Sequence, residues 1–192
     1  MPKVSTKRSD KRWQDDRGDI WASEFEFRVF SGIQAALARD TVSSCDTGVS
    51  DGHSFDYTTP VSGGACMECG SSVVVQRRVY TPDICVVHRD AESGPTFIEA
   101  KGYMPATRRH LLRCFHKTGP DIDLVFVLQA DTKATKTRTL SEWVTSFLPG
   151  VPCFVWNPCA RPTRKRSIEE IQACPVELKD FLIAAQHQDL RF

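Results

Sequence analysis

The sequence predicts an α/β protein with a central mixed β-sheet flanked by helices. Apolar, β-rich runs alternate along residues 20–157 with segments of helical periodicity. Two of those runs, 84–87 and 96–98, are separated by a polar turn that contains Gly and Pro, which predicts a strand hairpin. A third run, 122–128, is apolar at nearly every position, as is typical of a strand covered on both faces.

The helices follow from periodicity and end signals. Phe25, Val29, Ile33 and Leu37 recur every fourth residue and predict a helix over 23–39. Pro105 and the Gly-Pro pair at 119–120 bound a second helix that ends near residue 117. Thr and Ser three residues before Glu predict capping boxes at 139–142 and 167–170, and a last helix is expected over 176–186.

Three further segments complete the expected organisation. Residues 40–63, rich in Ser, Thr, Gly and Asp, are expected to form a loop with one short strand near 54–57. Residues 73–79 predict a strand that leads into the hairpin, and 153–156 another strand.

Length and composition indicate one core with appendages. With 192 residues, 41% of them apolar, the chain can bury one sizeable core. We expect a disordered charged arm at 1–19, a main domain at 20–157 with a Cys-containing insertion at about 40–76, and a basic segment with helices at 158–192. The sequence contains no long apolar run and no signal-peptide core, which favours a cytoplasmic protein without membrane segments.

The charges are segregated along the chain although their formal sum is only +1. Between Lys101 and Arg138 eight Lys or Arg stand against three Asp, and four of the six residues 161–166 are basic. Such blocks are typical of solvated faces or of surfaces that bind phosphate. The candidate nucleic-acid contacts are Arg108, Arg109, Arg113, Lys117, Lys133, Lys136 and Arg138.

The predicted hairpin carries acids at the ends of its strands. Asp83 precedes the first strand, while Glu99 and Lys101, two residues apart, point to the same side of the second. Buried carboxylates are unfavourable unless they are compensated, and a metal would compensate them. Asp83, Glu99 and the carbonyl of Ala100 could hold Mg²⁺, with Lys101 placed to polarise a metal-bound water or to hold a phosphate oxygen. The alternative is a surface hairpin with an Asp cap and a Glu/Lys pair, but the flanking apolar runs favour burial.

At these residues the chain resembles a known group of enzymes. Pro82-Asp83, a spacer and Glu99-Ala100-Lys101 form the core motif of the restriction-endonuclease-like, PD-(D/E)xK, nucleases. The ordered run of 80–83, 97–102, 108–112 and 121–126 resembles the bacteriophage endonuclease I family of Holliday-junction resolvases. The resemblance covers about 20–157, apart from the insertion and a longer turn in the hairpin, and implies a restriction-endonuclease-like core.

The resemblance also implies an activity. It implies a metal-dependent DNA endonuclease that resolves four-way junctions and other branched DNA, using one or two Mg²⁺ (or Mn²⁺) ions per site. It implies a catalytic Glu in the first helix, which matches Glu26; the residue's other role is to cap its own helix, and Glu24 is the alternative acid. An intertwined homodimer, in which the first helix of one subunit serves the other's site, is implied as well. The compartment would be the host cytoplasm if the chain is phage-encoded.

The cysteines suggest a second metal. Cys66 and Cys69 form a Cys-x-x-Cys-Gly sequence that resembles half of a zinc knuckle, but a structural Zn²⁺ needs four ligands. Two protomers could each donate this pair, or the pair could be reduced thiols or a redox couple. Ligands from elsewhere in the chain would be Cys45 and His53 or, more remotely, Cys153 and Cys159.

Two other functions remain open from the sequence. One is a nickase or repair nuclease on the same fold, since a fold does not fix its substrate. The other is a non-catalytic, zinc-bearing nucleic-acid-binding protein whose carboxylates are structural. Lys101 favours an enzyme, because a binding module does not need a Lys beside Glu99 at a buried strand end.

Overall fold

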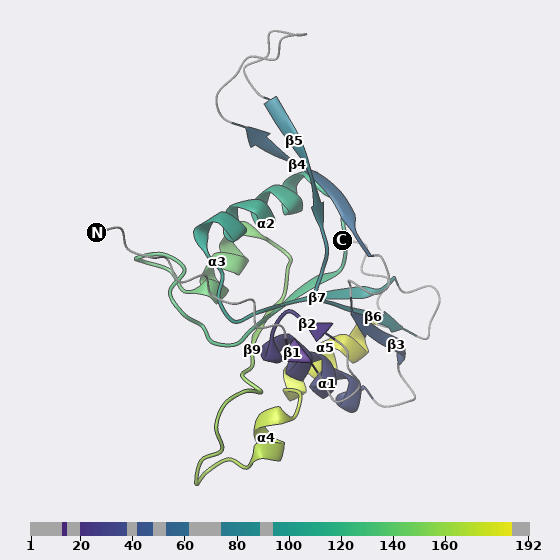
Figure 1. The fold of residues 1–192 in the computed structure, drawn as a ribbon, viewed down its shortest axis with the longest axis vertical. Helices are drawn as coiled ribbons and strands as arrows, with labels where there is room; N and C mark the ends of the chain where they lie inside the picture. The colour runs from purple at the N-terminus through teal and green to yellow at the C-terminus, as the bar shows by residue number, and fades with distance from the viewer. Residues whose placement is uncertain are drawn as a thin grey trace, which may run out of the picture.

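The structure, a computed structural model, describes residues 13–14, 20–37, 42–47, 53–61, 74–88 and 94–185. It is an α/β fold in which helices flank a mixed five-stranded sheet (Figure 1). Within these residues, none of the helices combines the length and the apolar character needed to cross a membrane.

The central sheet joins an antiparallel half to a parallel half. The first three strands in sheet order pair antiparallel, and the third, fourth and fifth pair parallel. The predicted hairpin is therefore confirmed, and it lies at the centre of the sheet. The sheet order is β3 (Val42–Thr47), β6 (Ile84–His88), β7 (Thr96–Lys101), β8 (Leu124–Leu128) and β9 (Cys153–Val155).

One face of the sheet is covered by α1 (Glu24–Ala36) and α5 (Val176–Ala184). Val29 and Ile33 of α1 and Leu178 and Leu182 of α5 are fully buried in one cluster. Because side chains alternate along a strand, every second strand residue points into this cluster. The strand residues concerned are Ile84, Val86, Ile98, Ala100, Val125 and Val127.

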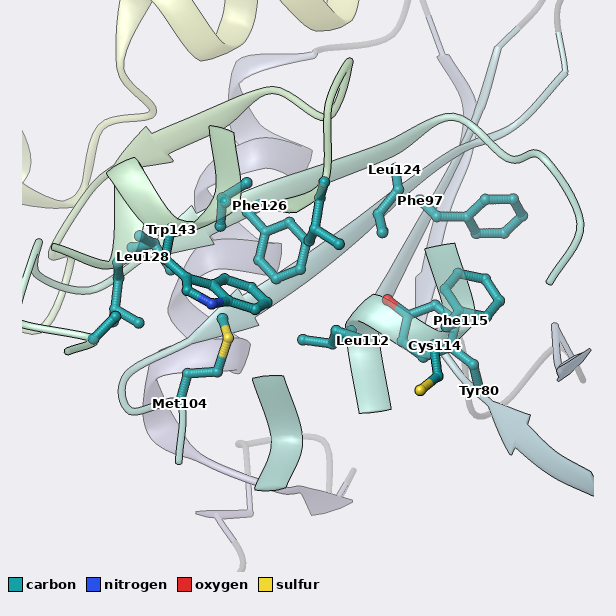
Figure 2. Close-up of a cluster of buried hydrophobic side chains, with 14 of the residues drawn as sticks. Tyr80, Phe97, Met104, Leu112, Cys114, Phe115, Leu124, Phe126, Leu128 and Trp143 are labelled. Carbon is teal, nitrogen blue, oxygen red and sulfur yellow. The ribbon is translucent and has the colours of Figure 1, made fainter. Parts of the chain in front are cut away.

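The other face is covered by α2 (Ala106–Thr118) and α3 (Leu140–Phe147), as Figure 2 shows. Both helices were predicted, and α3 opens with the expected capping box between Thr139 and Glu142. The intervening strand residues, which include Phe97, Leu124, Phe126 and Leu128, meet the buried helix side chains here. The nearly continuous apolar run of β8 is thus buried on both sides.

A two-stranded ribbon projects from the body beyond α2 (Figure 1). It pairs β4 (Phe55–Val61) antiparallel with β5 (Val74–Tyr80). The expectation of a loop over 40–63 with one short strand was wrong, since the described part of that stretch contains β3 as well as the longer β4. The sequence of β3 is mostly polar because the strand lies at the edge of the sheet.

The chain after residue 157 packs on the main body, where Leu178 and Leu182 join the core cluster. The Trp156 indole N–H donates to the carbonyl of Ile171, which lies in α4 (Ile168–Gln172), at 3.1 Å. Gly32 of α1 allows this close approach, because a Cβ there would lie 2.4 Å from the Trp156 ring and 2.9 Å from the Gln172 carbonyl. At the other end, β1 (Trp13–Gln14) pairs with β2 (Ile20–Trp21), so part of the expected disordered arm forms a strand.

Candidate active site

The sheet brings the motif residues together at the ends of β6 and β7. The Asp83 N–H donates to the Ile98 carbonyl at 3.1 Å, so Asp83 stands at the entry to β6 beside β7. The Asp83 Oδ2 accepts a hydrogen bond from the Ala100 N–H at 2.8 Å, so a side-chain oxygen takes the part of a backbone carbonyl of the neighbouring strand. Glu99 and Lys101 lie on the same side of β7, as predicted, with Lys101 Nζ 3.1 Å from Glu99 Oε1.

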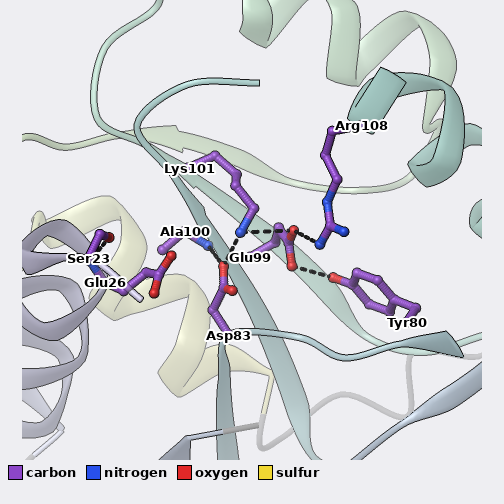
Figure 3. Close-up of polar contacts among 8 residues, drawn as sticks. All are labelled: Ser23, Glu26, Tyr80, Asp83, Glu99, Ala100, Lys101 and Arg108. Carbon is purple, nitrogen blue, oxygen red and sulfur yellow. Dashed lines mark hydrogen bonds and ion pairs between the residues drawn. The ribbon is translucent and has the colours of Figure 1, made fainter. Parts of the chain in front are cut away.

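Lys101 bridges the two carboxylates (Figure 3). Its ammonium also lies 2.6 Å from Asp83 Oδ2. Burial lowers the pKa of Lys101, but the charges of Glu99 and Asp83 outweigh burial and raise that pKa above its usual value. The ammonium therefore stays charged and lies between the two carboxylates.

Glu99 is completely buried and receives several donors. The Tyr80 hydroxyl donates to Oε2 at 2.8 Å, and Arg108 Nη2 donates to Oε1 at 3.2 Å. Burial and then the Glu99 charge raise the pKa of Tyr80, so its hydroxyl keeps its proton for this bond. From the sequence alone, Tyr80 had no role beyond the motif and Arg108 was predicted as a DNA contact; the packing of α2 adds a contact of Arg108 with Glu99, and the DNA contact stays a prediction.

The pKa of Asp83 lies near neutral pH, well above the usual value of an Asp side chain. Burial, followed by repulsion from Glu99, raises its pKa to about 7, although the Lys101 charge opposes the shift. A carboxylate with this pKa is readily recruited by a cation that replaces its proton.

Glu26 reaches the same site from the first turn of α1. Its N–H donates to Ser23 Oγ at 3.2 Å, so it occupies the predicted capping position, while its carboxylate points toward Asp83 and Ala100 (Figure 3). Burial raises the pKa of Glu26; the Lys101 charge opposes this and the Glu99 charge adds to it. Glu24 instead pairs with Arg28 at 2.8 Å, and its side chain is 42% exposed. Of the two acids, Glu26 is the one that faces the site.

This end of the sheet carries carboxylate and carbonyl oxygens, the ligands that hard divalent cations prefer. Carboxylates of three acids converge, and the Ala100 carbonyl points to the β6 side, because the N–H and C=O of a strand residue share one direction. Pro82 precedes Asp83 on that side and has no N–H to donate to the carbonyl. Within the described parts of the chain, no three His, Cys, Asp or Glu side chains already form a ligand set. The Lys101 ammonium instead contacts the carboxylates of Asp83 and Glu99.

The other candidate DNA contacts lie around α2 and α3. Arg109 Nη1 donates to the Met104 carbonyl at 2.7 Å. The guanidinium groups of Arg113 and Arg138 lie 4.5 Å and 5.3 Å from the centre of the Phe147 ring, which brings two cations from separate elements together. The remaining candidates are exposed: Lys117, Lys133 and Lys136.

The predicted zinc ligands are only partly described. Cys66 and Cys69 lie outside the described residues, and Cys45 lies in β3. The His53 ring packs edge-on against Phe97, with ring centres 5.4 Å apart. Cys153 is a free thiol whose pKa burial raises to about 12, and Cys159 is a free thiol as well. The zinc site stays a prediction.

Comparison of the chain with protein-family models, with curated proteins and with solved structures finds no match.

Proposed function

We propose that the protein is a metal-dependent DNA endonuclease that resolves four-way junctions and other branched DNA by phosphodiester hydrolysis. The observation that carries the proposal is the convergence of Glu26, Asp83 and Glu99 on Lys101 at the ends of β6 and β7. A purely structural cluster would gain little from three buried or half-buried acids around one ammonium, since buried charges are weak stabilisers.

The architecture supports a restriction-endonuclease-like core as the finer description of the fold. An antiparallel hairpin at the centre of the sheet carries the acids, and a parallel strand follows it after a helix. Helices cover both faces, which buries the hairpin and keeps the carboxylates at fixed positions. Because folds are shared among functions, the proposed activity rests on the site and not on this likeness.

In this proposal Asp83, Glu99 and the Ala100 carbonyl would hold Mg²⁺ or Mn²⁺, with Glu26 completing the set. When bound, such a metal supplies charge stabilisation of the phosphate and a water of lowered pKa. Lys101, released from Asp83, orients the attacking water or donates to a phosphate oxygen.

Arg108 has a double part in this proposal. One amino group stays on Glu99, and because the side chain is 40% exposed, the rest of the guanidinium can meet the DNA backbone. Attack by water on phosphorus, with cleavage of the P–O3′ bond and departure of the 3′ oxygen as the hydroxyl, would leave a 5′-phosphate and a 3′-hydroxyl.

A homodimer is part of the proposal, because a four-way junction offers two equivalent strands and a two-fold dimer offers two equivalent sites. In this structure α1 packs against β7 of its own chain, which brings Glu26 to the site of its own subunit. Exchange of α1 between subunits stays a prediction. Sizing at micromolar concentration tests the dimer, and a monomer would contradict it.

The test compares a labelled four-way junction with a linear duplex of matching sequence, each in Mg²⁺ and in EDTA. Wild type should make paired, metal-dependent nicks in opposing arms of the junction. Glu99→Gln should still bind the junction but lose cleavage, since it removes the charge and keeps the shape of the side chain.

Two outcomes would favour other functions. Equal metal-dependent cutting of both substrates would indicate a nickase or repair nuclease without junction selectivity. Tight binding without cutting in Mg²⁺ or Mn²⁺ would indicate a nucleic-acid-binding protein that has no catalytic role.

A further inference from the structure

The β4–β5 ribbon is fixed to the active site at its base. Tyr80, the last residue of β5, donates its hydroxyl to Glu99 at 2.8 Å. Thr58 of β4 is held by α2, because Thr118 Oγ1 accepts from its N–H and lies 3.0 Å from its carbonyl oxygen. From this base the ribbon extends away from the body (Figure 1). These contacts at its base fix the direction of the ribbon relative to the carboxylates of the site.

The two faces of the ribbon differ. Tyr57 pairs with Arg78, and directly opposed residues of antiparallel strands share a face. Tyr57 packs edge-on against Phe115 of α2, with ring centres 5.6 Å apart, so this is the inner face. Arg77 belongs to the outer face, between Val75 and Val79, which are 59% and 62% exposed.

Positive charge continues along the inner face. Arg78 stands directly opposite Tyr57 in the strand pairing; burial raises the pKa of Tyr57, and the charges of Arg108 and Arg78 both lower it. Arg108 is bonded to Glu99, and Arg78 is exposed on β5 with its Nη2 2.7 Å from Gln76 Oε1. In the described part of the ribbon the single acid is Asp56, which pairs with Val79 on the outer face.

The spacing suits a DNA strand that leaves the site. Arg78 is two residues from Tyr80, and two strand residues span about 7 Å. Measured along the axis of a duplex, that length covers about two base-pair steps, at about 3.4 Å each. A DNA phosphate that contacts Arg78 would thus lie only a few nucleotides from the phosphate bound beside Glu99.

We propose that the inner face of the ribbon is a DNA-binding surface, on which Arg78 contacts the phosphate backbone of the strand that leads away from the scissile bond. The inference rests on the proposed function and adds to it a contact that the sequence did not single out. Gln76 accepts a hydrogen bond from the guanidinium, α2 packs against Tyr57 and Tyr80 through Phe115, and Arg78 and Gln76 of β5 are exposed beyond that contact, where DNA can reach them.

The test measures binding of a labelled four-way junction in EDTA, so that cleavage does not interfere, over a series of salt concentrations. Arg78→Gln should weaken binding about fivefold to tenfold at 0.1 M salt and reduce the slope of log K against log salt by about 0.9. Arg77→Gln, one residue away on the outer face, is the matched control and should bind as wild type. Thermal unfolding of both variants checks that each is folded.

The outcomes separate this inference from the proposed function. Unchanged binding by Arg78→Gln overturns the inference, and equal weakening by both variants overturns the assignment to one face. Cleavage of the junction by wild type in Mg²⁺ tests the endonuclease itself. If wild type cuts the junction and Arg78→Gln binds it as tightly as wild type does, the proposed endonuclease is supported and only the ribbon contact is wrong. If wild type binds without cutting and Arg78→Gln weakens binding, the ribbon contact stands and the endonuclease fails. A wild-type protein that neither binds nor cuts the junction overturns both.

Discussion

Lys101 Nζ lies 2.6 Å from Asp83 Oδ2, and this ion pair joins the end of β7 to the residue that precedes β6. The ammonium also lies 3.1 Å from Glu99 Oε1, and Arg108 is a second cation on that carboxylate, so Lys101 links the two acids and Arg108 shares their compensation. A divalent cation and this ammonium would compete for the same oxygens. The stability of the metal-free protein and its affinity for metal should therefore be linked through Lys101.

Lys101→Met tests that link. Without Mg²⁺ the variant should be destabilised, by up to about 3 kcal/mol, because removing one partner leaves buried charges without compensation. Mg²⁺ should raise its melting temperature more than that of wild type, while cleavage is lost. Thermal unfolding with and without Mg²⁺ measures both effects, and an equal Mg²⁺ response in the two proteins would contradict the competition.

The raised pKa of Asp83 predicts a pH dependence of stability. The folded state binds the Asp83 proton up to about pH 7, whereas the unfolded state releases it near the usual 3.8. The free energy of unfolding of the metal-free protein should therefore fall as pH rises through this interval, with a limiting slope of about 1.4 kcal/mol per pH unit. Melting temperatures of wild type and Asp83→Asn between pH 5 and 8 isolate the contribution, which the variant should lack.

Mg²⁺ should reverse this trend, because it binds the ionised form of Asp83. The gain in melting temperature on adding Mg²⁺ should increase between pH 6 and 8, and the cleavage rate should rise over the same interval. A cleavage rate that is flat from pH 6 to 8 would argue against ionisation of Asp83 as the controlling step.

Glu26 and Glu24 form a matched pair on the first turn of α1. Glu26→Gln should lower the cleavage rate at least tenfold, because this carboxylate faces Asp83, whereas Glu24→Gln should leave it near the wild-type rate. Single-turnover cleavage of the junction compares the two variants. Equal rates would reduce Glu26 to its capping role.

Leu182 tests whether the chain beyond residue 157 belongs to the main body. It is fully buried with α1 against the sheet, so Leu182→Ala should lower the free energy of unfolding by about 2–5 kcal/mol. Urea unfolding followed by fluorescence should show one transition at a lower midpoint. Two separate transitions would indicate instead that this segment folds as an independent unit.

Much of the fold was predictable because local signals agreed with the tertiary structure. The capping box at Thr139, the four-residue spacing in α1 and the apolar run of β8 each specify an element without knowledge of its neighbours. The same holds for Asp83, Glu99 and Lys101, whose contacts follow from pairing two adjacent strands.

What the sequence did not predict depends on contacts between distant elements. The polar strand β3 is recognised only by its pairing with β6, because an edge strand needs little apolar content. The sequence does not distinguish Arg108 from the other basic residues of its helix. Only the packing of α2 on the sheet shows that Arg108 contacts Glu99. In the same way, Arg77 and Arg78 are distinguished only by the register of the ribbon.

The shared burial of α1 and α5 has a consequence for the order of folding. During synthesis Glu26 leaves the ribosome before α5, but the cluster that buries its helix includes Leu178 and Leu182, about 150 residues later in the chain. Contacts of such long sequence separation form slowly, because the loop between them must close first. The hairpin with Asp83 and Glu99 can form well before α1 is locked in place. A nascent chain would thus lack a fully assembled centre until α5 has emerged, so that this late packing step delays the onset of any activity at the site.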